Sequence, residues 1–128
     1  MLSEEEAFGL LHRHVRNDKL RKHMLAVATI MHRLARKLKE NSRLWFLTGL
    51  LHDLDYELVE NFKEHGVKSA EILRNILPEE ALEAIRAHNE MTGYESKTKL
   101  AIALKAADQV SGLIIATALV MPHKKLEE

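Results

Sequence analysis

Residues 43–54 read RLWFLTGLLHDL, and apolar side chains cover every side of the helix that they would form. At about 100° per residue, Leu44, Trp45, Leu47 and Leu50 point in different directions, so the segment has no polar face. A helix that is apolar all round is buried in the middle of its domain. We therefore expect residues 43–54 to form the central helix, with the ionisable pair His52-Asp53 at its end.

Two helices are expected before the central one. Ser3 and Glu6 form a capping box that opens a helix running through about Val15. Asn17 caps a longer helix that ends near Asn41, and its apolar residues recur at helical spacing. These residues are Leu20, Met24, Val27, Met31, Leu34 and Leu38.

Three more helices are expected after a polar loop, DYELVENFKEHG, at residues 55–66. The pattern predicts them at about 65–77, 78–88 and 98–120, with one proline in a first turn and another beyond the last end. No segment shows strand alternation of useful length. The expected fold class is all-α, a compact bundle of about six helices.

The composition favours one domain that spans residues 1–128. We expect its last residues, 121–128, to form a frayed tail. Nineteen basic residues balance nineteen acidic ones, which predicts no nucleic-acid partner and no anionic membrane surface. No apolar run approaches the roughly 20 residues of a membrane span, and the acidic start does not resemble a signal peptide. A soluble, cytoplasmic protein is expected.

Several ionisable residues occupy positions that the helical pattern places inside. His23 follows the buried side of its helix, and His88 follows the inner face of residues 81–85. Asp108 interrupts an apolar row, although an unpaired buried carboxylate costs several kcal/mol. Each could have a structural explanation alone, such as an ion pair between Asp108 and Lys105. Together the inward set comprises His23, His52, Asp53, His65, His88 and Asp108.

Four imidazoles and two carboxylates form a set of metal ligands. The chain has no cysteine, so thiolate sites are excluded and any metal must be held by nitrogen and oxygen. Such ligands suit a divalent ion of iron, manganese, cobalt, nickel or zinc. Six ligands, one of them able to bridge, are about what two adjacent metal ions require.

The order His, His-Asp, Asp resembles the signature of the HD-domain metal-dependent phosphohydrolases. The resemblance runs from LRKHMLAVA at residues 20–28 through GLLHDLDYEL, KEHGVKSAEIL and AIRAHNE to ALKAADQVSGLIIATALV. It implies that His23, His52, Asp53 and Asp108 are the shared ligands. The two additional histidines resemble those of the HDIG-type branch, which implies a second metal held by His65 and His88, with Asp53 as the bridging, catalytic carboxylate.

The resemblance is incomplete immediately after the His-Asp pair. Asp55 and Tyr56 stand where HDIG-type proteins have Gly and Lys, and no Gly-Tyr-Pro segment indicates a cyclic-dinucleotide phosphodiesterase. The substrate therefore stays open. Asn89 and Lys105 are candidate substrate-binding residues, with helix capping by Asn89 and an ion pair of Lys105 as the structural alternatives.

These observations predict a metal-dependent phosphohydrolase that cleaves a phosphoester or phosphoanhydride of a small, nucleotide-like molecule. The alternatives are a nucleotidase with one metal ion, a helical module that binds a nucleotide or partner without turnover, and a dimetal oxygenase. A homodimer is a further expectation, because the apolar residues 112–120 suit either a core or a dimer interface.

Overall fold

The computed structural model describes the backbone of residues 2–120 and the side chains of residues 2–112. The expected tail at 121–128 lies outside the described residues. Within the described part the chain forms helices and loops without a strand, so the predicted all-α fold is confirmed. Its elements are α1 (Glu4–His14), α2 (Asp18–Leu38), α3 (Ser42–Leu51), η1 (Phe62–Glu64), α4 (Val67–Ile72), α5 (Glu79–Ala87), η2 (Glu90–Thr92) and α6 (Lys99–Val120).

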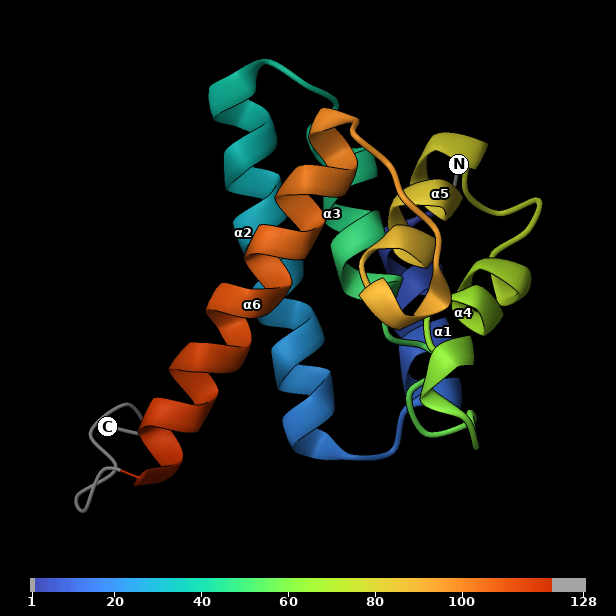
Figure 1. The fold of residues 1–128 in the computed structure, drawn as a ribbon. Coiled ribbons are helices and arrows are strands. Elements are labelled where there is room, and N and C mark those ends of the chain that lie inside the picture. Colours follow the sequence, from blue (N-terminus) through green and yellow to red (C-terminus); the bar gives the residue numbers. More distant parts are fainter. Residues whose placement is uncertain (1, 121–128) are drawn as a thin grey trace.

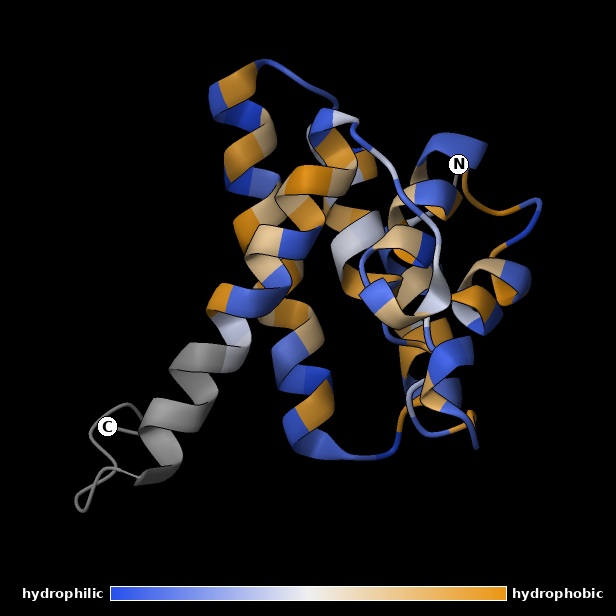
Figure 2. Ribbon diagram, in the orientation of Figure 1, coloured by the Kyte–Doolittle hydropathy of each residue, from blue (hydrophilic) through white to orange (hydrophobic). Residues whose placement is uncertain are grey.

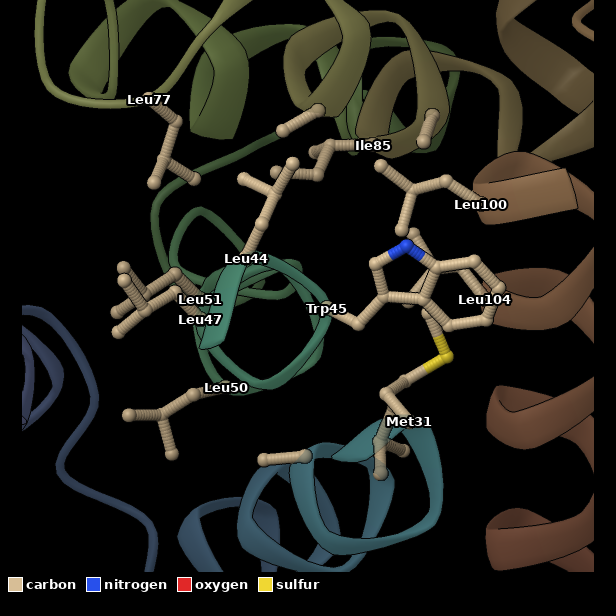
Figure 3. Close-up of a cluster of buried hydrophobic side chains, with 14 of the residues drawn as sticks. Met31, Leu44, Trp45, Leu47, Leu50, Leu51, Leu77, Ile85, Leu100 and Leu104 are labelled. Carbon is tan, nitrogen blue, oxygen red and sulfur yellow. The ribbon is translucent and has the colours of Figure 1, made fainter. Parts of the chain in front are cut away.

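Helix α3 lies in the middle of the molecule, with α2 and α6 to one side and α1, α4 and α5 to the other (Figure 1). Leu47 and Leu51 are fully buried on one side of the helix, whereas Leu44 and Trp45 leave it in two other directions (Figure 3). Trp45 packs toward α2 and α6, beside Met31 (Figure 3). Burial all round α3 brings the end of this helix, and the His-Asp pair that follows it, to the interior.

The crossing of α2 and α3 is unusually close at Gly49. A Cβ atom added there would lie 2.9 Å from Ala28 Cα, closer than side chains approach a backbone. Glycine therefore allows the two helices to touch through their backbones one turn before His52. Hydrophilic residues gather in the loops at both ends of α2, whereas the core side chains lie between the helices (Figures 2 and 3).

The predicted caps are present. The side chain of Ser3 accepts from Glu6 N in a capping box, and Asn17 and Asn41 cap α2 and α3. Among residues 2–120, no helix has the length and apolar character needed to cross a membrane.

The fourth helix is much shorter than the predicted 65–77. Gly66 has φ 101°, so α4 cannot begin before Val67, and His65 ends the preceding 3₁₀ turn instead. The regular helix ends at Ile72, and Asn75 adopts a left-handed φ of 67° in the turns that follow. Asn tolerates that conformation better than most residues.

Candidate metal centre

The structure brings all six predicted ligands together from five segments. His23 lies in α2, His52 and Asp53 follow α3, and His65 precedes α4. His88 follows α5, and Asp108 lies in α6. Their nitrogen and oxygen atoms form two groups, each within 4.8 Å: His23, His52, Asp53 and Asp108, and Asp53, His65 and His88.

Asp53 belongs to both groups through different oxygen atoms. Its Oδ2 lies 3.5 Å from His23 Nε2 and 3.2 Å from His52 Nε2. Its Oδ1 lies 2.9 Å from His65 Nε2 and 3.3 Å from His88 Nε2. Asp108 completes the first group, because its Oδ1 lies 2.7 Å from His23 Nε2 and 3.1 Å from His52 Nε2. Asp53 therefore contributes one oxygen atom to each of the two groups.

The other ring nitrogens fix how these histidines are turned. His52 Nδ1 donates to Gly49 O at 2.6 Å, and His88 Nδ1 donates to Ile85 O at 2.5 Å. A carbonyl oxygen can only accept, so the ring proton must be on Nδ1. In the neutral ring, Nε2 then presents its lone pair to the carboxylates, which is how a metal-ligating histidine is oriented.

Two buried atoms at the centre lack a hydrogen-bond partner among the described residues. They are Asp53 Oδ1 and His88 Nε2. Both lie close to other ligand atoms, yet no hydrogen bond with suitable angles forms at either. Buried polar atoms of this kind normally find a partner. A metal ion between them would supply one, so the residues present fit a divalent cation.

The electrostatics among these histidines and carboxylates favour charged pairs. Burial by itself lowers the pKa of His52, but the carboxylates of Asp53 and Asp108 outweigh it and raise that pKa well above its usual range. Burial by itself raises the pKa of Asp53. The neighbouring histidines outweigh this effect and lower that pKa well below its usual range. Burial by itself lowers the pKa of His65, but the carboxylates of Asp53 and Asp55 outweigh it and raise that pKa to about 9. Metal ions therefore compete with protons for these nitrogens.

Asp55 is a further residue of the site, which the sequence comparison treated only as a departure from the HDIG pattern. Its carboxylate is fully buried and accepts from His65 Nδ1 at 2.7 Å. It also accepts from the backbone N–H groups of Gly66 at 2.7 Å and Ser69 at 3.0 Å. Asp55 thus holds His65 and the start of α4 in place. The sequence does contain a signal for this role, because Asp55 is a second carboxylate only two residues after the buried His52-Asp53 pair.

The two candidate substrate-binding residues lie in different places. Asn89 lines the cavity over the metal centre, and its Nδ2 donates to Phe62 O and His65 O at 2.8 and 3.1 Å. Lys105 forms an ion pair with Glu90 and lines a separate cavity beyond η2. Lys19, which the sequence did not single out, does line the cavity over the metal centre.

That cavity has a volume of about 520 Å³, the size of a small-molecule site. Five of the six ligands contribute to its wall, whereas His52 lies fully buried behind them. Lys19, Leu20, Tyr56 and Phe62 also line the cavity. A small substrate can therefore reach the metal ligands from solvent.

Comparison with known proteins agrees with this arrangement. The model of the HD domain matches residues 20–113, a range that contains all six ligands and Asp55. HD domains bind divalent metals and are in general metal-dependent hydrolases. No curated protein and no solved structure gives a significant match to the chain. The match over most of the chain shows that this protein belongs to the HD domain family.

Proposed function

We propose that this protein is a metal-dependent phosphohydrolase with a binuclear centre, which cleaves a phosphoester or phosphoanhydride of a small, nucleotide-like molecule. The observation that carries the proposal is the position of Asp53, whose two oxygens each face a different pair of histidines. A single carboxylate between two imidazole pairs suits two adjacent ions better than one.

Each metal position has its own ligands. His23, His52, Asp53 and Asp108 would hold the first ion, and Asp53, His65 and His88 the second. The second group has fewer protein ligands and so leaves more positions for water and substrate. Two bound ions would lower the pKa of water toward neutrality and stabilise the negative charge that develops on the phosphoryl oxygens.

The residues of the chain prepare the site for that chemistry. Backbone carbonyls hold the Nδ1 protons of His52 and His88, so their Nε2 atoms stay directed at the centre. The Asp55 carboxylate does the same for His65. Because these contacts exist before substrate binds, little reorganisation is needed during the reaction.

The test is hydrolysis by protein that was expressed with added iron, manganese, cobalt, nickel or zinc. Its substrates should include phosphomonoesters, phosphodiesters and pyrophosphates. We expect the protein to release phosphate from at least one of these substrates. Chelators should abolish this activity, and the metal used in expression should restore it when added back. The variant Asp53→Asn should be inactive. Fully metal-loaded protein that hydrolyses none of these classes would refute the proposal.

A mononuclear nucleotidase is the second candidate, because the first group is complete with four ligands without His65 and His88. The variant His88→Ala separates the two. With this variant, a binuclear enzyme loses one metal equivalent and most of its activity. A mononuclear enzyme keeps its single metal ion and its activity.

A further inference from the structure

Two aromatic side chains stand exposed at the cavity over the metal centre. Tyr56 is 50% exposed and Phe62 46%, although aromatic side chains of this size usually bury more of their surface. Both line the same cavity, and their ring centroids are 6.4 Å apart at an interplanar angle of 84°. Exposed aromatic surface beside a binding cavity is a feature of ligand recognition.

The two rings are held at a fixed place next to a metal ligand. Phe62 stacks on His65 with centroids 5.0 Å apart and planes 26° apart, and Tyr56 meets the same imidazole edge-on at 5.3 Å. The backbone of Phe62 is tied to Asn89 by a hydrogen bond. A flat ligand group that packs on these rings would therefore lie close to the reacting phosphate.

The charge at the cavity fits a substrate with a single phosphate. Among the described residues that line it, Lys19 is the one lysine or arginine. The other charged group near the opening is Glu57, whose carboxylate accepts from the backbone N–H groups of Arg16 and Asn17. Metal ions and one lysine can neutralise one phosphoryl group, but a chain of phosphates requires more cations.

On the basis of the proposed phosphohydrolase function, we propose that Tyr56 and Phe62 form an aromatic platform that selects phosphomonoesters with a planar ring. A base or other flat ring stacks on one of the two perpendicular rings and meets the other edge-on, while its phosphate reaches the metal ligands. Phosphomonoesters without a planar ring bind the metal centre and Lys19 alone.

The direct test compares adenosine 5′-monophosphate with ribose 5-phosphate, which has a hydroxyl group at C1 in place of the base. The ratio of their kcat/KM values should be on the order of 5- to 150-fold, the range expected for stacking one base on aromatic side chains. Phe62→Ala and Tyr56→Ala should each reduce the ratio, with unchanged metal content. The control Tyr94→Ala, which removes the equally exposed tyrosine of the other cavity, should leave the ratio as it is.

The outcomes separate the platform from the proposed function. A ratio near one in the wild-type protein, or a ratio that survives both substitutions, would overturn the platform while hydrolysis still stands. Loss of bound metal in Phe62→Ala would show that the ring only supports His65, and would also overturn it. If neither compound is hydrolysed, calorimetric binding of the two compounds to the metal-loaded protein decides, because the platform predicts the same preference in Kd.

Discussion

The histidines at the metal centre differ in what holds their second nitrogen. His52 and His88 donate Nδ1–H to backbone carbonyls, whereas His65 donates to the ionised carboxylate of Asp55. A charged acceptor makes the imidazole a stronger ligand than a neutral one. His65 is therefore the stronger ligand, and it belongs to the smaller of the two groups, which consists of Asp53, His65 and His88.

In the proposed binuclear centre, the variant Asp55→Asn should weaken the second metal position selectively. An amide gives up the charge and cannot accept from His65, Gly66 and Ser69 as the carboxylate does. We expect a loss of about 10- to 100-fold in affinity for one of two metal equivalents, measured by calorimetry. The control is Glu60→Gln, which changes an exposed glutamate of the same loop, and equal affinities in both variants would contradict this role of Asp55.

At this scale the sequence predicted the ligands but not their supports. His23 and His88 were found because they lie on the buried faces of their helices, and Asp108 because it interrupts an apolar row. The structure places all three in the two groups that share Asp53. Asp55 lies in a loop, where no periodicity tells which side chain turns inward. The sequence also could not tell that Lys19, and not Lys105, lines the cavity over the metal centre, because this depends on how the helices are packed.

The central position of α3 can be predicted from its sequence, because a helix without a polar face must be surrounded by other elements. Its close approach to α2 depends on Gly49. The shortened α4 could not be predicted, because apolar spacing continues through Ile76 and Leu77 while the backbone leaves the helix at Ile72. Periodicity does not reveal a left-handed Asn75.

The variant Gly49→Ala should destabilise the fold by about 1–3 kcal/mol, because its methyl group forces α2 and α3 apart. Denaturant unfolding measures this loss. The matched control is Gly9→Ala in α1, where a Cβ meets nothing within 4 Å. That change should be stabilising by up to about 1 kcal/mol, because alanine favours helix. Equal effects would contradict the close crossing.

Glu57 connects the loop after the His-Asp pair to the start of α2, because its carboxylate accepts hydrogen bonds from the backbone there. The strength of this connection depends on pH. The backbone N–H groups of Asn17 and Arg16 hold the pKa of Glu57 below its ordinary value of 4.5. The ionised group therefore stabilises the fold above that value, and its contribution is lost as pH falls through the folded pKa.

We expect Glu57→Ala to lower the melting temperature at pH 7, and the difference from the wild-type protein to shrink below pH 4.5. Thermal melts across pH measure both effects. Glu60→Ala removes an exposed glutamate that has no hydrogen bond among the described residues, and it should show neither effect. A Glu57→Ala difference that is independent of pH would contradict this account.

The molecule as a whole is organised so that five segments meet at one point (Figure 1). Metal ions bound there would link α2, α6 and the ends of α3 and α5, which are far apart in the sequence. The fold class and this convergence followed from buried helical faces. The shape of the cavity did not, since it depends on the loops around η1 and η2.

Metal removal should therefore lower the stability of the entire fold. Ligands that bind only the folded state stabilise it by about 2.7 kcal/mol at a free concentration of 100 Kd. We expect chelated protein to melt at a lower temperature in one transition, and added metal to restore it. In Asp53→Asn the same additions should have little effect. An equal rise in that variant would place the stabilising metal elsewhere.

Elemental analysis of the purified, metal-supplemented protein tests the binuclear centre most directly. The proposed binuclear centre predicts two metal equivalents per chain, about one in His88→Ala, and almost none in the double variant His52→Ala/Asp53→Ala. Two equivalents that persist in His88→Ala, or a single equivalent in the wild-type protein, would contradict a centre bridged by Asp53.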